Sequence, residues 1–341
     1  MKVFPQWLIA LSASVAFLSG CGWVDEDLSD CGKELDIDCE VKMQTNMQTE
    51  LSTVLSQIED QFVKAQLQEW LGDILTENAN DVDLSFYDTE GANSRLAHMD
   101  VNMGGSQAVY TLTIPARDYL HTCVANVAEN DQVALVDAET FHGGRLRQFS
   151  EREVEEGLMP TKNILQADSV HSHNTCVYAG RKWIRMQAGE SQNIDVKLYP
   201  VSSASALVLD YAQAGPIGQV RVIAEGFANA FNVADSIFYF TDPMPVKATF
   251  LQAEEGTEDS FVAVHFPSKD GASWHWTVDV PLSDGSVTRS VLTVNEVLAA
   301  GQLKVLKAKI YDNGVVATDD PMVGVSVTLQ WNEAEEHDIE L

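Results

Sequence analysis

The sequence has few basic residues. Lysine and arginine together number 21 in 341 residues, against 51 aspartates and glutamates, which gives a formal net charge of -30 at pH 7. Proteins that bind nucleic acid neutralise backbone phosphates with lysine and arginine, so this composition excludes nucleic acid as a partner. An acidic surface also disfavours close contact with an anionic membrane face. Solubility of an exported protein is an equally good explanation of the charge.

The chain also lacks the motifs of the common enzyme classes. It contains no Gly-x-Ser-x-Gly elbow, no His-Glu-x-x-His motif and no glycine-rich phosphate loop. The strongest metal candidate is His171-Ser172-His173, but no third ligand accompanies the pair, and structural hydrogen bonding explains these histidines better. We therefore expect no catalytic residues, no cofactor and no metal site, and we interpret the chain as a non-enzymatic protein.

The apolar run at the N-terminus is too short to span a membrane, because a spanning helix needs about 20 apolar residues. The run extends from Trp7 to Leu18, follows Lys2, and ends in Ser19-Gly20-Cys21. This pattern is typical of a bacterial lipoprotein signal peptide cleaved before the cysteine. We predict residues 1–20 as the signal peptide and Cys21 as the lipidated mature N-terminus, where acyl chains such as palmitate would anchor the protein. A secretory signal with an incidental cysteine is the alternative.

Cysteine is scarce as well. If Cys21 carries lipid, four cysteines remain, which is an even number in an oxidising compartment. We predict the disulfides Cys31–Cys39, which is local, and Cys123–Cys176, which joins two predicted strands. Spacing alone leaves three connectivities open, and buried thiols without disulfides are the alternative. No pair has the spacing of a zinc site.

Short segments of alternating apolar and polar residues dominate the rest of the chain and predict an all-β protein. Between Thr49 and about Leu75, apolar residues instead recur at spacings of three and four, which predicts one long amphipathic helix lying on a sheet. Turn sequences such as Asp312-Asn313-Gly314 separate the later strands and favour a β-sandwich. The predicted strands are 35–43, 82–87, 108–114, 119–126, 176–186, 193–201, 206–211, 219–225, 236–240, 246–252, 261–266, 274–282, 287–294, 303–311 and 323–331. Residues 137–170 have a polar, loop-like composition.

Composition shifts along the chain predict the domain organisation. An acidic tether over 21–34 precedes an N-terminal β-sandwich domain over 35–202, which contains the helix at about 49–75. A proline and a serine-rich stretch mark its end. A C-terminal β-sandwich domain follows over 203–332, and residues 333–341 form an acidic tail.

Trp274-His275-Trp276 is the strongest candidate for ligand binding. Residues two apart on a strand face the same side, so the two indoles could stack on a sugar. Core packing is the favoured interpretation of the pair. A surface glycan-binding lipoprotein is nevertheless the alternative function.

Several motifs in order give the chain a family resemblance. It resembles the fimbrial anchor lipoproteins of Bacteroidetes, the FimB-type minor-fimbrium anchors, over nearly the whole mature chain. The motifs are Asp27-Leu28-Ser29-Asp30-Cys31-Gly32, Tyr110-Thr111-Leu112-Thr113-Ile114-Pro115 with Tyr119-Leu120-His121 and Asn126, and His171-Ser172-His173 with Arg181. At two strand positions where the family usually has small residues, this chain has Cys123 and Cys176, which supports a bond between them.

The resemblance implies two tandem transthyretin-like β-sandwich domains, lipid-anchored in the outer membrane and exposed at the base of a fimbrium. It also implies that the protein attaches fimbriae to the cell surface, either as the anchor or as a minor subunit, by β-strand complementation with other fimbrial subunits. A host or bacterial surface ligand would be a further partner.

The first arginine of the chain is Arg95, so an arginine-specific protease could not trim a short N-terminal strand. The mature N-terminus is therefore expected to be permanent. Residues Val323 to Trp331 are the first candidate contact element for a partner strand.

Overall fold

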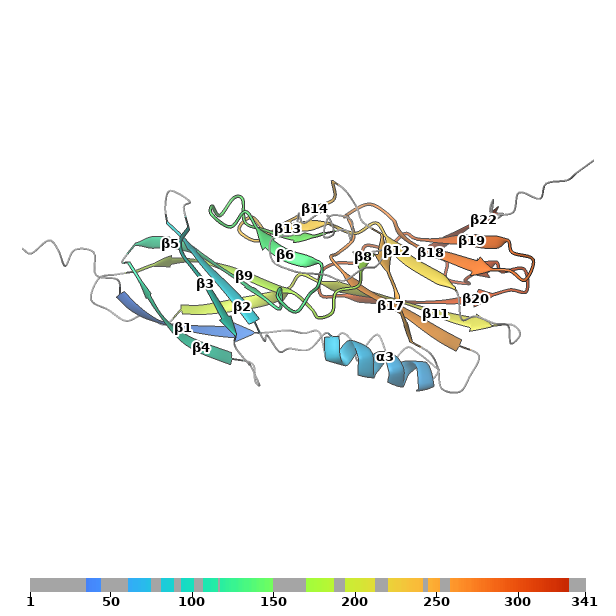
Figure 1. The fold of residues 1–341 in the computed structure, drawn as a ribbon, viewed down its shortest axis with the longest axis horizontal. Helices are drawn as coiled ribbons and strands as arrows, with labels where there is room; N and C mark the ends of the chain where they lie inside the picture. Colours follow the sequence, from blue (N-terminus) through green and yellow to red (C-terminus); the bar gives the residue numbers. More distant parts are fainter. Residues whose placement is uncertain are drawn as a thin grey trace, which may run out of the picture.

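The structure is a computed structural model, and it describes residues 35–43, 61–74, 81–88, 93–100, 107–115, 117–149, 170–186, 194–211, 220–241, 245–251 and 258–330 (Figure 1). These residues form four β-sheets and one helix. The expected all-β class with one amphipathic helix is confirmed. The signal peptide, Cys21, the tether, Cys31 and the acidic tail lie outside the described residues. No helix in the described ranges is long and apolar enough to cross a membrane.

A seven-stranded sheet occupies the N-terminal half. Its strand order is β3 (Asn93–Asp100), β2 (Asp81–Tyr87), β5 (Asp118–Ala125), β9 (Tyr178–Arg185), β10 (Ile194–Pro200), β1 (Leu35–Met43) and β4 (Gln107–Ile114). Strand β10 pairs in parallel with β1 over five residues but with β9 only at Tyr199 and Pro200. Strand β10 therefore joins the strands β3, β2, β5 and β9 to the strands β1 and β4. The sequence did not predict β3.

Two facing sheets form a sandwich in the C-terminal half. The first sheet has the order β16 (Thr249–Leu251), β17 (Glu258–His265), β11 (Ser203–Tyr211), β20 (Leu303–Ile310) and β21 (Val316–Ala317). The second has the order β22 (Val323–Gln330), β19 (Val287–Val294), β18 (Trp274–Pro281), β12 (Arg221–Glu225), β15 (Val246–Lys247) and β8 (Val170–His171). Leu207 and Leu306 of the first sheet and Trp276 and Leu292 of the second share one buried core. Alternation along the strands positions these residues inward.

The predicted turns join strands of this sandwich. Gly271, Gly285 and Gly314 all have positive φ angles, of 70°, 86° and 77°. Glycine adopts this conformation without the penalty that a Cβ atom brings. At Gly314 a Cβ would also lie 2.9 Å from Leu282 Cδ2, so both the backbone and the packing require glycine there.

A four-stranded sheet combines strands from both sides of residue 202. Its order is β14 (Ile237–Tyr239), β13 (Ala230–Asn232), β7 (Arg145–Gln148) and β6 (Val133–Val136). Leu146 of β7 is opposite Phe231 of β13, and both pack against Val124 and Ala179 of the seven-stranded sheet. Part of the predicted loop 137–170 is therefore strand. The predicted boundary after residue 202 stays a prediction, and β11 begins at Ser203.

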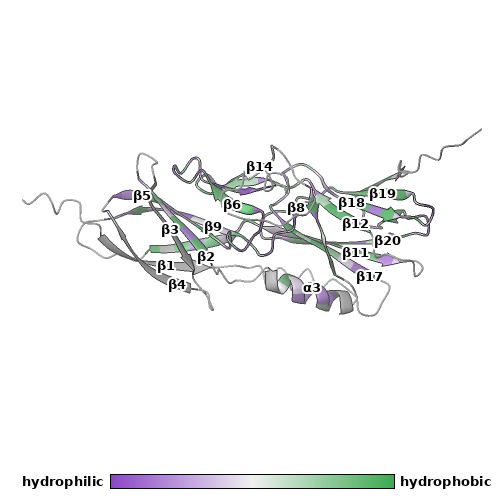
Figure 2. Ribbon diagram, viewed as in Figure 1, coloured by the Kyte–Doolittle hydropathy of each residue, from purple (hydrophilic) through white to green (hydrophobic). Residues whose placement is uncertain are grey.

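Helix α3 (Gln61–Ile74) lies within the range predicted for the long helix. Its buried residues Leu67 and Leu71 share a core with Ala206 of β11 and Val262 of β17, and Trp70 packs beside them. Figure 1 shows the helix beneath β11 and β17, and Figure 2 shows its mixture of hydrophobic and hydrophilic residues. The helix thus covers the outer face of a sheet in the C-terminal half, although it comes early in the chain.

Candidate docking edge

Strand β22 forms one edge of the C-terminal sandwich. It pairs with β19 along its whole length, from Val323 opposite Val294 to Gln330 opposite Val287. Its other side pairs with no strand of the described chain. An unpaired strand edge presents backbone donors and acceptors that a further strand can bind. The segment 323–331, predicted from the sequence as a contact element, therefore includes an edge strand.

Two valines of β22 face the core side of the sandwich but remain exposed. Val325 is opposite Leu292 and Val327 is opposite Ser290, and both β19 residues are completely buried. Cross-strand partners share one face of a sheet. Val325 and Val327 are nevertheless 40% and 43% exposed. The edge therefore offers apolar side chains as well as free backbone groups.

The facing sheet is incomplete next to this edge. Strand β21 has two residues and pairs with β20 only at Lys309 and Ile310. Beyond them, Thr318 Oγ1 donates a hydrogen bond to the Lys307 carbonyl, at 2.6 Å. The described part of β20 therefore has a strand partner on this edge only near its end, and the residues after β21 lie beside it, with Asp320 Oδ2 3.8 Å from Lys304 Nζ.

A groove of about 440 Å³ lies beside β20 on the outer side of the same sheet. Its lining is charged with both signs: Lys307 and Lys309 come from β20, whereas Asp210 and Glu258 come from β11 and β17. Lys307 Nζ lies 4.0 Å from Glu258 Oε1. Asp319 and Asp320 also line the groove, so its four carboxylates outnumber its two lysines and the groove disfavours an anionic ligand.

The two tryptophans of Trp274-His275-Trp276 do not form a surface platform. Trp274 is 1% exposed and Trp276 is completely buried, and both belong to the sandwich core. Trp274 Nε1 donates a hydrogen bond of 3.0 Å to the Glu296 carbonyl. The sugar-stacking hypothesis at these residues is wrong, because β18 lies inside its sheet and their face of it points into the core.

The two histidines of His171-Ser172-His173 lie in different environments. His171 is exposed, whereas His173 is buried, with Nδ1 3.1 Å from Ser202 Oγ. Burial lowers the pKa of His173 to about 3, so the ring is neutral at pH 7. Within the ranges that the structure covers, no group of three or more histidine, cysteine, aspartate or glutamate residues is placed to hold a metal ion.

The predicted disulfide Cys123–Cys176 is not formed. Both residues are buried thiols in the structure. Cys123 is opposite Gly180 of β9, whereas Cys176 precedes that strand, and both side chains belong to one buried core. The expected disulfide is therefore corrected to two reduced thiols. Cys39 lies in β1, and its bond to Cys31 stays a prediction.

This correction can be tested by alkylation. Burial raises the pKa of the Cys176 thiol to about 12, which suppresses the reactive thiolate. We expect no labelling of Cys176 by iodoacetamide in the folded protein. After unfolding in urea without reductant, both Cys123 and Cys176 should be labelled in peptide mass spectra. A peptide pair joined through these two cysteines would contradict the structure.

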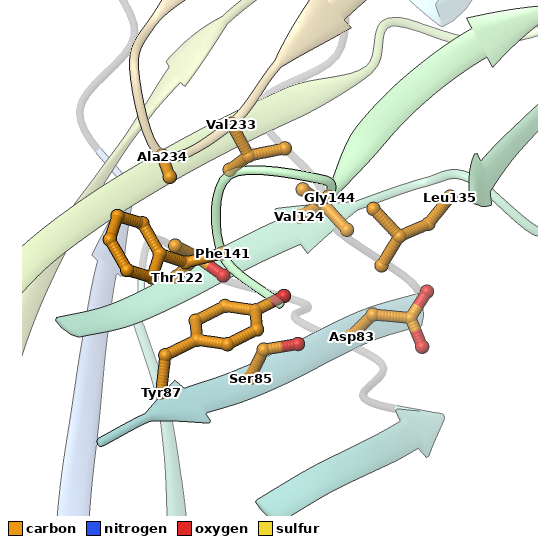
Figure 3. Close-up of a pocket in the computed structure, with 10 residues that line it drawn as sticks. All are labelled: Asp83, Ser85, Tyr87, Thr122, Val124, Leu135, Phe141, Gly144, Val233 and Ala234. Atoms are coloured by element: carbon orange, nitrogen blue, oxygen red, sulfur yellow. The ribbon is translucent and has the colours of Figure 1, made fainter. Parts of the chain in front are cut away.

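A small hollow lies between the seven-stranded sheet and the loop after β6 (Figure 3). Tyr87 and Ser85 of β2 line it from one side, and Phe141, Gly144 and Val233 from the other (Figure 3). Its volume is about 10 Å³, close to what one water molecule needs. The hollow is too small for a cofactor or a sugar.

No protein-family model and no curated protein sequence matches this chain. Solved structures do resemble it. One is a candidate polysaccharide-binding protein from Bacteroides thetaiotaomicron, with 9% identity, a TM-score of 0.52, and coverage of 84% of this chain and 97% of that one. Another is a candidate adhesin from Bacteroides ovatus, with 11% identity, a TM-score of 0.51, and coverage of 83% and 93%.

The fimbrial anchor protein Mfa2 from Porphyromonas gingivalis is also similar in structure, with 8% identity, a TM-score of 0.47, and coverage of 87% of this chain and 99% of that one. At such identities the likeness concerns the fold. The two Bacteroides structures, with TM-scores of 0.52 and 0.51, show that this chain shares their fold, which agrees with the fold expected from the resemblance to FimB-type fimbrial anchors.

Proposed function

We propose that this chain is a lipoprotein of the outer membrane that attaches fimbriae to the cell surface, as the fimbrial anchor or as a minor fimbrial subunit. Its partners are other fimbrial subunits, and it catalyses no reaction. The single observation that supports this role best is the open edge of β22 with its half-exposed valines.

The chemistry of that edge suits strand complementation. An added strand would receive backbone hydrogen bonds from β22, and its alternate side chains would cover Val325 and Val327. Covering apolar surface stabilises such a complex by about 25 cal/mol per Å².

The proposed organisation has a lipid at one end and a docking edge at the other. Cys21 would hold the acyl chains, and residues 21–34 would form the tether. Two tandem transthyretin-like β-sandwich domains, over 35–202 and 203–332, would place β22 in the domain farther along the chain from the lipid. This arrangement would put the protein at the fimbrium base, exposed on the cell surface.

The role of β22 can be tested in the cell that makes the protein. Replacing both Val325 and Val327 with aspartate would place two charges where a partner strand packs. We expect at least a tenfold loss of fimbrial subunits co-purifying with the protein, because buried unpaired charge costs several kcal/mol. Filaments should then be found in the medium rather than on cells.

Two further variants separate docking from anchoring. Val297→Asp changes a valine that is also 43% exposed but lies outside β22, and it should retain wild-type binding. Cys21→Ala should release the protein together with its filaments, because docking persists without the lipid. Filaments that stay on cells in both the Val325→Asp/Val327→Asp and the Cys21→Ala strains would overturn the proposal.

A further inference from the structure

A second open surface lies on the seven-stranded sheet, in the other half of the chain from β22. On β9, Arg181, Trp183 and Arg185 occupy alternate positions and therefore share one side of the sheet. Tyr199 of β10 is opposite Ala179 of β9, which has the same parity as Trp183, so Tyr199 lies on that side as well. We call the side that carries Trp183 and Tyr199 the β9–β10 face.

Other parts of the same side are covered. Ala179 is 5% exposed and shares a core with Leu146 of the four-stranded sheet. Leu120 of β5, the cross-strand partner of Trp183, is 2% exposed and packs with Ala234. The four-stranded sheet and its loops therefore cover this side at Ala179 and Leu120 but leave Trp183 open.

Two aromatic rings stand in solvent on the uncovered part. Trp183 is 65% exposed and Tyr199 is 57% exposed, the highest values for large hydrophobic side chains in the described chain. At this exposure neither ring contributes to a core, so packing does not explain them. Single exposed aromatic residues are common on surfaces, but two on one open sheet face form a patch that is typical of a binding surface.

Charged residues of both signs lie around the rings. Arg185 donates from Nε and Nη2 to the two carboxylate oxygens of Asp118, at 3.0 and 3.2 Å. Lys197 is exposed, but Asp195 occupies the same side two positions earlier in β10, and Glu40 of β1 is opposite Asp195. A local surface of mixed sign selects no charged polymer, and the net charge of -30 repels polyanions further.

A neutral sugar polymer matches this combination of rings and charges. The C–H faces of a pyranose ring pack on an indole or phenol ring, and the sugar hydroxyls both donate and accept hydrogen bonds. Arginine and lysine donate to such hydroxyls, whereas carboxylates accept from them, so a face of mixed sign satisfies a ligand that is neutral but rich in hydroxyls. A protein partner is disfavoured, because the centres of protein interfaces are depleted of lysine and acidic residues.

The spacing of the rings indicates a polymer rather than a single sugar. Trp183 is four positions from Ala179, the partner of Tyr199, so the two ring-bearing positions are about 13 Å apart along the strands. That span exceeds one sugar ring. Arg181 of β9 and Lys197 of β10 lie between the two positions, where the intervening sugars would pass.

We propose that the β9–β10 face binds an extended neutral polysaccharide. Trp183 and Tyr199 stack on two separate sugars of one chain, and Arg181 and Lys197 donate hydrogen bonds to the hydroxyl groups between them. This binding function does not depend on the fimbrial role, because the face lies on a different sheet from β22.

Calorimetric titration of the full mature chain with cellohexaose, mannohexaose and xylohexaose tests the proposal. We expect at least one of these neutral oligomers to bind with an affinity that does not change as salt rises, because no charged pair forms. The disaccharide of the same sugar should bind at least tenfold more weakly, since it reaches only one ring. The acidic oligomer hexagalacturonate should not bind.

Substitutions on the face separate stacking from general surface effects. Trp183→Ala and Tyr199→Ala should each weaken binding by about tenfold or more, whereas Trp183→Phe keeps an aromatic ring and should retain most of the affinity. Tyr311→Ala is the matched control, since Tyr311 is 48% exposed but lies outside the face, and it should bind as the wild type does. Val325→Asp/Val327→Asp should also bind normally, which keeps this test independent of fimbrial docking.

The proposal would be overturned if none of the three neutral hexasaccharides bound, if hexagalacturonate bound as well as they do, or if the disaccharide bound equally. Equal losses in Trp183→Ala and Tyr311→Ala would also overturn it. Loss of co-purifying fimbrial subunits in Trp183→Ala, without any loss of sugar binding, would instead identify the face as a protein interface.

Discussion

Acidification from pH 7 to pH 5 is expected to lower the free energy of unfolding by about 6 kcal/mol, because three histidines are buried in neutral form. His121 and His265 are completely buried and His173 is 3% exposed. Burial is the main cause that lowers their pKa values, to about 4 for His121 and about 3 for His173 and His265. The nearby charge of Lys182 lowers the pKa of His121 further.

The sign of this pH effect follows from the number of protons bound by the folded and unfolded states. In the unfolded chain a histidine titrates near pH 6.5, so below that pH the unfolded state binds a proton that the folded state does not accept. Each buried histidine therefore costs about 1.4 kcal/mol of stability per pH unit between pH 6.5 and its folded pKa. At pH 5 the sum for three histidines is comparable with the whole stability of many domains, which is about 5 to 15 kcal/mol.

Urea unfolding at pH 7, 6 and 5 measures this effect, and at these values most carboxylates are still ionised. His265→Gln should reduce the pH-dependent loss by about one third. Lys269→Gln, at an exposed lysine, is the control and should leave the pH dependence unchanged. Equal unfolding free energies at pH 7 and pH 5 would contradict the burial of neutral histidines.

The second large effect is expected at Trp276. Replacing this completely buried indole with alanine should lower the free energy of unfolding by about 3 to 5 kcal/mol, because it leaves a cavity between the two sheets. Trp276→Phe should cost much less, since the Trp276 Nε1 group has no hydrogen-bond partner. Trp274→Phe should cost about 1 kcal/mol more than Trp276→Phe, because it removes the bond to the Glu296 carbonyl.

Trp183→Ala provides the matched control, and it should change the unfolding free energy by no more than about 0.5 kcal/mol. Chemical unfolding of the four variants measures both sets of values. If Trp276→Ala were as stable as the wild type and Trp183→Ala were strongly destabilised, the assignment of core and surface would be reversed.

Local sequence patterns predicted most of the secondary structure. Alternation located β5, β18, β19, β20 and β22 to within a few residues, and the helical repeat located α3. The turn sequences were reliable because glycine at positions such as Gly285 and Gly314 satisfies a backbone requirement that depends only on neighbouring residues. The polar composition of 137–170 obscured β7, whose partner β13 lies far away in the sequence.

Ligand candidates were harder to predict, since alternation does not reveal which face of a strand is covered. Trp274 and Trp276 have the same spacing as Arg181 and Trp183, yet the first pair is buried and Trp183 is exposed. The basic and aromatic alternation of β9 was the one signal of an open face that the sequence carried.

Residues close together in the chain specify the all-β class, most strands, their turns and the amphipathic character of the helix, so local patterns were enough to predict them. Long-range contacts decide that α3 covers β11 and β17, that β6 and β7 join β13 and β14, and that Cys123 and Cys176 are buried thiols. They also decide which faces and edges stay open. These features depend on long-range pairing of strands and on which apolar surfaces meet, and the spacing of residues along one chain does not encode either in a form that local patterns reveal.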